Sequence, residues 1–234
     1  MKLAILFDLG NTLVAYYRRE EFRPVLEQAI QNILDELNSS GIRTVSSEQA
    51  MQTALAENRE AGDYQVTQIT QRFERIFKIT LQDEHLTRRL CEHFLTPIFA
   101  MSYIYEDVLP TLAQLKASGY VTAIISNAPW GSPANLWRDE LSRLGLTGQV
   151  DEVVFCTDVG WRKPDARIFL HTVEQLGVEC NNCIFVGDDP EWDIAGSVAL
   201  GMRPVLIDRD NHHTNFSGER ILGLDELLLL IQDK

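Results

Sequence analysis

Short, continuous runs of apolar residues recur along the chain, and longer stretches with helix-period apolar positions lie between them. Continuous hydrophobicity is typical of strands that are covered on both faces. The expected strands are Leu3–Phe7, Val121–Ile125, Val153–Phe155, Ile184–Val186 and Val205–Ile207. The expected helices are Val108–Ala117, Pro133–Leu144, Pro164–Leu176, Glu191–Leu200 and a final one at Leu224–Ile231. This alternation predicts an α/β fold with a doubly wound, Rossmann-like parallel sheet.

The stretch from Arg18 to Met101 differs, because it contains no convincing strand. Helix-period apolar positions instead occupy Phe22–Asn38, Ser47–Arg59, Gln65–Lys78 and Asp83–Thr96. We therefore predict an α-helical cap subdomain inserted after the first strand. The expected division is a core of residues 1–15 and 103–234 and a helical cap of residues 16–102.

Two local signals predict where helices of the core end and begin. Gly119 follows the expected helix Val108–Ala117, at the position where a left-handed glycine commonly ends a helix. Ser132 is expected to cap the next helix, with Pro133 in its first turn.

The length of the chain limits the number of domains, and its charge limits the classes of partner. The chain has 234 residues, a net charge of −13 and a pI of about 4.8, which suits one domain with a smaller insert. An acidic surface repels nucleic acid and anionic membranes, so neither is expected as a partner. No apolar run approaches a membrane span of roughly 18 residues, and Asp8 ends the first run too early for a signal peptide. We expect a cytoplasmic protein, and its oligomeric state is left open.

The four cysteines, Cys91, Cys156, Cys180 and Cys183, do not form the pattern of a disulfide framework. Cys180 and Cys183 have redox or zinc spacing, but no second pair accompanies them. Cys183 also begins an apolar run, so packing is the favoured interpretation.

Polar residues follow the expected strands, and in a doubly wound sheet ligands bind beyond the carboxyl ends of the strands. The segments that follow four of the strands are, in order, Asp8–Thr12, Ser126–Asn127, Trp161–Pro164 and Gly187–Asp193. Each segment is a weak signal alone, but together and in this order they form a strong pattern.

Three acids in these segments, Asp8, Asp188 and Asp193, are expected to converge on one edge of the sheet. Carboxylates this close cannot all stay ionised without a cation. A hard divalent ion with oxygen ligands, most simply Mg²⁺, meets that need. The sequence therefore predicts a magnesium site.

The same edge offers groups that can bind a phosphate. Lys163 can hold Asp8 and a phosphate oxygen together. The Ser126 hydroxyl and the backbone amides of Asn127 and of the Leu9–Asn11 turn can bind the remaining oxygens.

With these residues in this order, the chain resembles the haloacid dehalogenase superfamily of hydrolases, which are mostly phosphatases. The resemblance covers nearly the whole chain, because the helical insert lies where the subgroup with an α-helical (C1-type) cap carries its cap. It implies that Asp8 is the nucleophile, Lys163 the catalytic lysine and Ser126 a phosphate ligand. It also implies that Mg²⁺ is bound by Asp8, the carbonyl of Gly10, Asp188 and Asp193.

The implied reaction is hydrolysis of a small phosphorylated metabolite. Asp8 would attack phosphorus in line, and water would then hydrolyse the aspartyl-phosphate intermediate. Mg²⁺, Lys163 and the backbone donors would hold the charge of the transition state.

One position departs from the pattern of the family's phosphatases. Gly10 stands where they usually have a second Asp, which protonates the leaving oxygen. General acid–base help of this kind is typically worth ~10²–10⁴-fold. Three interpretations stay open: a phosphatase with another proton source or a good leaving group, a dehalogenase or phosphonatase, and a binding or regulatory protein. Dehalogenation is disfavoured because a halide needs no metal, and phosphonatase chemistry because the insert has only Lys78 to supply a cap lysine.

Several neighbouring residues have two interpretations. Asp189 is either a second metal ligand or the N-cap of the next helix. The Asn127 side chain positions substrate, which we favour, or serves only the turn. Thr12 is expected to tie its loop together. Arg18, beside Arg19 near the first hinge, is a candidate phosphate ligand, or part of a solvated, charged helix start.

Three tryptophans, Trp130, Trp161 and Trp192, are expected to surround the mouth of the site. Packing between core and cap is the favoured interpretation, and stacking on an aromatic or sugar-like leaving group is the alternative. His212 and His213 are expected in a solvated loop rather than at a metal.

Overall fold

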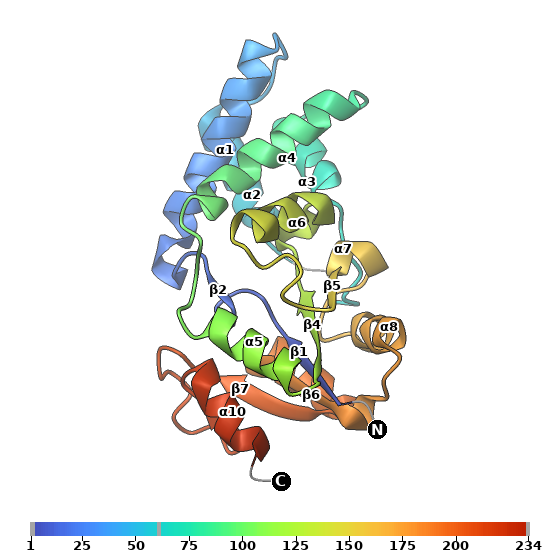
Figure 1. The fold of residues 1–234 in the computed structure, drawn as a ribbon. Coiled ribbons are helices and arrows are strands. Elements are labelled where there is room, and N and C mark those ends of the chain that lie inside the picture. Colours follow the sequence, from blue (N-terminus) through green and yellow to red (C-terminus); the bar gives the residue numbers. More distant parts are fainter. Residues whose placement is uncertain (1–2, 60–61, 233–234) are drawn as a thin grey trace.

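A computed structural model describes residues 3–59 and 62–232. In this part of the chain, six strands form one parallel sheet in the order β5-β4-β1-β6-β7-β8 (Figure 1). The strands are β1 (Ala4–Phe7), β4 (Val121–Ser126), β5 (Glu152–Phe155), β6 (Cys183–Gly187), β7 (Arg203–Ile207) and β8 (Arg220–Ile221). The predicted α/β fold is confirmed, and β8 is the strand of this sheet that the apolar pattern did not predict.

The order of the strands changes direction at β1, which is the switch point of the sheet. From β1 the chain builds outward through β4 and β5, and it then returns to the other side of β1 with β6. Phe7 lies opposite Ile124 of β4 and Val186 of β6, so the three strands end at nearly the same level. Side chains that follow these strands are therefore brought together at one edge.

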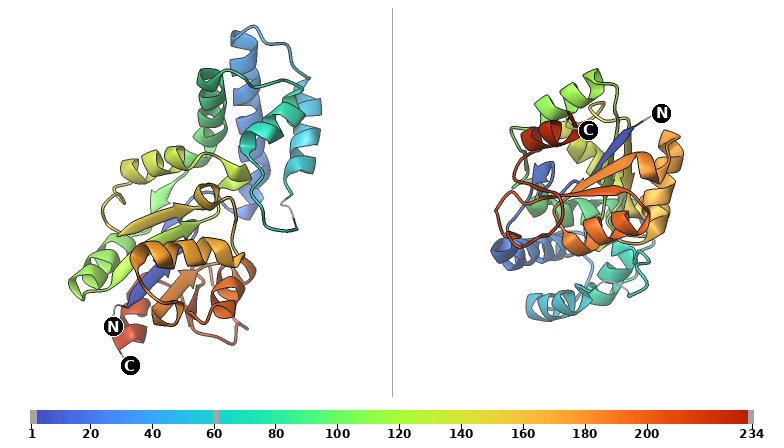
Figure 2. Two further views of the ribbon diagram at one scale, coloured as in Figure 1. Left: turned by 90° about the vertical axis from the view of Figure 1, so that its right-hand side faces the viewer. Right: turned by 90° about the horizontal axis from the view of Figure 1, so that it is seen from below.

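Helices cover both faces of the sheet, which is why its central strands are mostly apolar. Helices α5 (Val108–Ala117) and α10 (Leu224–Gln232) lie together on one face, and α8 (Ala166–Leu176) lies on the other (Figures 1 and 2). All residues of β1 and β4 are buried. The remaining helices of the core are α6 (Ala134–Arg143), α7 (Cys156–Val159) and α9 (Gly196–Ala199), with short helical turns η2 (Pro129–Gly131), η3 (Cys180–Asn182) and η4 (Pro190–Ala195).

The predicted helical insert stands beside the sheet as a separate layer (Figures 1 and 2). Its described part contains a short turn, η1 (Arg19–Glu21), and the four expected helices: α1 (Phe22–Ser39), α2 (Ser47–Glu57), α3 (Ile69–Phe77) and α4 (Glu84–Phe99). Two short strands, β2 (Val14–Ala15) and β3 (Tyr103–Ile104), pair antiparallel where the chain enters and leaves the insert. The boundaries 1–15, 16–102 and 103–234 stay a prediction. Residues 1–2, 60–61 and 233–234 of these ranges lie outside the described residues.

A segment before α3 joins the insert to the core at a second place. Val66 N donates to the Gly160 carbonyl and Arg162 N donates to the Tyr64 carbonyl, each over 3.0 Å. The prediction that the helix begins at Gln65 is therefore wrong: the backbone of this segment is extended and pairs with the core, and the helix begins at Ile69.

The two signals for helix ends had different outcomes. Gly119 follows the C-cap residue Ser118 of α5 and has a φ of 81°, as expected of a left-handed glycine at a helix end. The prediction of Ser132 as an N-cap is wrong, because α6 begins after Pro133 and has no side-chain cap. The Ser132 hydroxyl instead accepts a hydrogen bond from Trp137 Nε1 over 2.8 Å.

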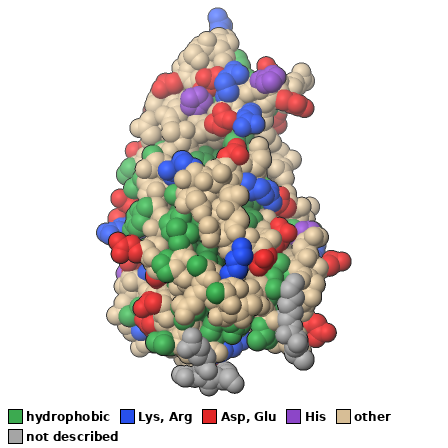
Figure 3. Space-filling model, viewed as in Figure 1, with side chains coloured by type: hydrophobic (Ala, Val, Ile, Leu, Met, Phe, Trp, Pro, Cys, Tyr) green, Lys and Arg blue, Asp and Glu red, His purple; other side chains and the backbone are tan. Residues whose placement is uncertain are grey.

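Charged side chains, thiols and two histidines complete the description of the fold. On the face shown in Figure 3, acidic and basic side chains are interspersed. Among the described residues, none of the helices has both the length and the apolar character of a membrane span. Cys183 is buried, and the described cysteines are all free thiols. The amides of His212 and His213 donate to the Asp208 carboxylate in an exposed loop.

Candidate active site

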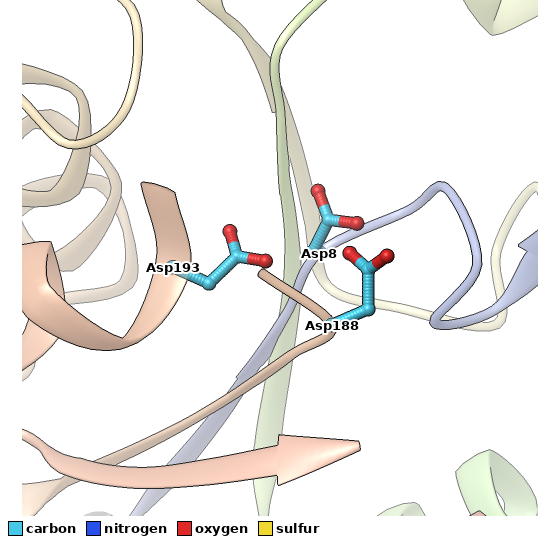
Figure 4. Close-up of side chains that lie close together, drawn as sticks. All are labelled: Asp8, Asp188 and Asp193. Atoms are coloured by element: carbon cyan, nitrogen blue, oxygen red, sulfur yellow. The ribbon is translucent and has the colours of Figure 1, made fainter. Parts of the chain in front are cut away.

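Three carboxylates meet at the switch point of the sheet (Figure 4). Asp8 follows β1, Asp188 follows β6, and Asp193 lies in η4. Asp8 N donates to the Val186 carbonyl over 2.9 Å, which continues the pairing of β1 with β6 by one residue. One oxygen of each acid lies within 4.8 Å of the others. The sequence prediction that these acids converge is confirmed.

Asp193 reaches this cluster because the chain turns sharply after β6. The Asp189 carboxylate caps the turn by accepting hydrogen bonds from Glu191 N and Trp192 N over 2.8 and 2.9 Å. Of its two interpretations, the N-cap is therefore the one that the structure supports. A β-carbon at Gly187 would collide with the Asp193 carboxyl group, so only glycine leaves room for this acid.

Lys163 links two of the acids. Its Nζ lies 2.5 Å from Asp8 Oδ1 and 2.6 Å from Asp193 Oδ1, and its side chain is almost completely buried. Asn127 fixes the backbone of this lysine from the neighbouring strand end. Lys163 N donates to Asn127 Oδ1 over 2.9 Å, and Asn127 Nδ2 donates to the Lys163 carbonyl over 3.2 Å. The Asn127 side chain therefore serves to position Lys163.

Burial and mutual repulsion raise the pKa values of two of the acids. Burial, together with the charges of Asp8 and Asp193, raises the pKa of Asp188 to about 8. Burial also raises the pKa of Asp193 to about 7, against the opposing effect of Lys163. Burial alone would lower the pKa of Lys163, but the charges of Asp193 and Asp8 outweigh it and raise that pKa. The cluster thus has three carboxylates against one lysine, and its carboxylate oxygens suit a hard divalent cation.

A cavity of about 330 Å³ opens over these groups. Its lining includes the acids and Lys163 together with Leu9, Gly10, Ser126 and Asn127. Arg18 is exposed, and it is not among the described residues that line this cavity. Its phosphate-binding role stays a prediction.

The structure adds lining residues that sequence reasoning missed. Arg162 is buried, with its guanidinium 5.1 Å from the centre of the Trp192 ring, and it brings a second cation to the cavity. Arg162 directly precedes Lys163 in the sequence, and this position could have identified it as a candidate for the site. Tyr16, Tyr17 and Trp137 form an aromatic part of the wall, and no motif pointed to them.

The Tyr16 ring stands beside the position of the missing acid. Its Cδ2 lies 3.8 Å from the point where a β-carbon on Gly10 would lie. Burial, with smaller effects of Glu140 and Asp8, raises the pKa of the Tyr16 phenol, so this side chain stays neutral. The wall of the cavity at this place is aromatic rather than acidic.

The three tryptophans have different environments. Trp130 packs between core and insert: its ring stacks on Phe94 with centroids 4.9 Å apart, and its Nε1 donates to Asn58 Oδ1 over 2.8 Å. Trp192 lines the main cavity. Trp161 lies under Arg167 and is not among the described residues that line this cavity, so the tryptophans do not surround the mouth together as predicted.

Thr12 does not tie its loop through its side chain. Its hydroxyl is buried without a hydrogen-bond partner among the described residues. The Thr12 carbonyl accepts from Arg209 Nη2 over 2.8 Å, and Asn11 Nδ2 donates to Asp188 Oδ2 over 3.2 Å. These contacts, rather than the threonine hydroxyl, connect the loop to its surroundings.

Comparison with known proteins agrees with this geometry. Residues 3–201 match the family described as haloacid dehalogenase-like hydrolase. A glyceraldehyde 3-phosphate phosphatase of Methanopyrus kandleri is 27% identical over 215 residues, covering 89% of this chain and 85% of that protein. A crystal structure of a HAD phosphatase from Thermococcus onnurineus has a TM-score of 0.68 and 28% identity, and covers 99% of this chain and 98% of that one.

A second kind of relative matches the chain over a shorter stretch. An (S)-2-haloacid dehalogenase of a Pseudomonas species is 33% identical over 113 residues, which covers 48% of this chain and 48% of that protein. The match to the family extends over most of the chain, from the first strand to the turn after α9. The chain therefore belongs to the haloacid dehalogenase-like hydrolases.

Proposed function

We propose that the protein is a Mg²⁺-dependent phosphomonoester hydrolase that acts on a small phosphorylated metabolite. The observation that carries the proposal is the contact of Lys163 with Asp8 beside two further acids at the floor of a 330 Å³ cavity. A phosphate would bring negative charge to a place that already holds three carboxylates, so it requires both the lysine and a divalent cation.

The reaction begins with the Asp8 carboxylate as nucleophile. Its oxygen forms a bond to phosphorus, while the bond from phosphorus to the leaving oxygen breaks and that oxygen keeps the electron pair. Water then attacks phosphorus in the aspartyl phosphate, which releases inorganic phosphate and regenerates Asp8. Lys163 neutralises charge on the phosphoryl oxygens, and the Ser126 hydroxyl with the amides of Leu9, Gly10 and Asn127 donates to them.

Asp8, Asp188, Asp193 and the carbonyl of Gly10 would hold the cation. When bound, Mg²⁺ supplies positive charge that offsets the carboxylates and the phosphate. The helical insert, residues 16–102, acts in this proposal as a cap that excludes water and selects the leaving group.

Dehalogenation is the second candidate, since Gly10 lacks the acid and one relative is a haloacid dehalogenase. The convergence of Asp188 and Asp193 on Asp8 argues against it, because a halide leaves without help from a metal. Phosphonatase chemistry needs a lysine from the cap. Lys78, the lysine of the insert, is exposed and is not among the described residues of the cavity wall.

The test is hydrolysis of p-nitrophenyl phosphate with and without Mg²⁺, in the wild type, Asp8→Asn and a control variant. Asp139→Asn is the matched control, because the Asp139 side chain is 72% exposed on α6. We expect turnover that requires Mg²⁺ and falls by at least ~10³-fold in Asp8→Asn, with the control unchanged. Turnover that survives in Asp8→Asn would overturn the proposal. Release of halide from a 2-haloacid, without phosphatase activity, would favour dehalogenation.

A further inference from the structure

A second cavity lies between the insert and the core and adjoins the first. It has a volume of about 110 Å³ and is bounded by α1, α4 and the turn η2. Tyr17, Ile98 and Pro129 line both cavities, so the two lie side by side. We call this second cavity the cap chamber. A substrate with its phosphate at Lys163 would have this chamber next to the cavity that holds its leaving group.

The wall of the cap chamber is apolar. Phe22, Val25 and Leu26 of α1 face Phe94 of α4 and Trp130 of η2. The described residues that line it include no Asp, Glu, Lys, Arg or His.

One hydrogen bond joins two polar side chains of this wall. The side-chain oxygen of Asn58 accepts from Trp130 Nε1 over 2.8 Å. A second phosphate or a carboxylate would lose its hydration here without meeting a cationic side chain, and the polar side chains of the lining are Tyr17, Asn58 and Trp130. A flat apolar group would instead be stabilised by contact with these rings.

The catalytic cavity sets an independent requirement on the leaving group. Gly10 offers no carboxyl to protonate the leaving oxygen, and the Tyr16 ring occupies the adjacent wall. An alkoxide is a poor leaving group without a proton. A phenol-like oxygen, with a pKa of about 10 as in tyrosine, carries the electron pair far more easily.

We propose that the substrate is an aryl phosphate monoester whose ring enters the cap chamber while its phosphate lies at Asp8 and Lys163. This inference rests on the proposed function. The Asp8 oxygen bonds to phosphorus, the bond from phosphorus to the aryl oxygen breaks, and the phenolate keeps the electron pair and later takes a proton from solvent. The chamber is of the right order for one ring, since a dry apolar cavity of about 150 Å³ binds benzene.

The experiment compares three phosphates in the presence of Mg²⁺: phenyl phosphate, acetyl phosphate and glyceraldehyde 3-phosphate. Acetate is a better leaving group than phenolate but has no ring, so a preference for phenyl over acetyl phosphate reports recognition of the ring. We expect kcat/KM for phenyl phosphate to exceed both others by at least about tenfold.

Chamber variants locate that preference. Leu26→Ala and the half-buried Phe22→Asn should lower kcat/KM for phenyl phosphate about five- to tenfold and leave acetyl phosphate unchanged. Leu34→Ala is the matched control, because Leu34 lies on the same helix and is 4% exposed like Leu26, but does not line the chamber. It should leave both substrates unchanged.

The outcomes separate the inference from the proposed function. Mg²⁺-dependent hydrolysis with equal or greater kcat/KM for glyceraldehyde 3-phosphate or acetyl phosphate would overturn the aryl substrate and leave the phosphatase in place. An aryl preference that Leu26→Ala and Phe22→Asn do not reduce would overturn the chamber as its origin. Hydrolysis of none of the three phosphates would overturn both.

Discussion

The ring of Tyr16 leaves room for a β-carbon on Gly10: that carbon would lie 3.8 Å from Tyr16 Cδ2, which is an ordinary van der Waals contact. A side chain can therefore be added at residue 10 without moving the backbone. We expect Gly10→Asp to supply the missing proton donor and to raise kcat for alkyl phosphates by about 10-fold or more. Steady-state kinetics with phenyl and ethyl phosphate would measure this, and the phenyl ester should change little.

Gly10→Asn is the control for that variant, because it has the same shape without the acid. An equal gain in Gly10→Asn would attribute the effect to shape or polarity and contradict the role of proton donation.

The acid cluster makes the stability of the metal-free protein depend on pH. Burial raises the pKa of Asp188 to about 8 in the folded protein, from 3.8 for an ordinary aspartate. The folded state therefore binds more protons than the unfolded state between these values, so the contribution of Asp188 to stability is lost as pH rises through this window. We expect Asp188→Asn, in EDTA, to gain stability relative to the wild type as pH rises from 5 to 8.5, by about a few kcal/mol in total.

Chemical denaturation at the two pH values measures this difference. Added Mg²⁺ should reverse it, because the cation stabilises the ionised cluster of the wild type. Parallel stability curves for the two proteins in EDTA would count against a perturbed Asp188.

Removing Lys163 should destabilise the fold as well as abolish turnover. In Lys163→Met, Asp8 and Asp193 would lose the cation that now lies 2.5 and 2.6 Å away. Breaking a buried ion pair on one side typically costs about 3–5 kcal/mol, and we expect a loss of that order in urea denaturation at neutral pH. Lys116→Met, an exposed substitution on α5, serves as the control. Equal stability of the two variants would show that the acids need no cation from the protein.

Gly131, in the turn η2 of the core, packs against Val66 and Thr67 of the insert. Its φ is 66°, and an added β-carbon would collide with the Thr67 carbonyl and lie 2.9 Å from Val66 Cγ1. Gly131→Ala should therefore lower the free energy of unfolding by more than about 2 kcal/mol. Gly148→Ala has a similar φ of 77° but open space around it, so it should cost only about 1 kcal/mol. Similar losses in both variants would mean that the contact with Thr67 relaxes.

Much of the site could be predicted because its residues follow directly from strand ends. Asp8, Ser126 and Asp188 each follow or end an apolar run, and parallel strands bring such positions to one edge. The convergence of Asp193 also required the tight turn after Gly187.

Other parts depend on packing that no local pattern encodes. Recognising Arg162 as a lining residue required knowing which loop enters the cavity. The partnership of Asn127 with Lys163 joins residues 36 positions apart. The cap chamber forms where α1 and α4 pack near η2. The sequence shows the apolar residues of these elements, but not that they enclose a cavity.

The backbone pairing of Tyr64 and Val66 with the core gives the insert a second attachment, remote from the junction of β2 and β3. If the insert swings away to admit a ligand, the amide protons of Val66 and Arg162 lose their acceptors in the same event. The rate at which these two amides exchange with deuterated solvent therefore reports how often the insert separates from the core at this attachment. Since Arg162 precedes Lys163, a ligand that occupies the cavity should slow exchange at both amides together.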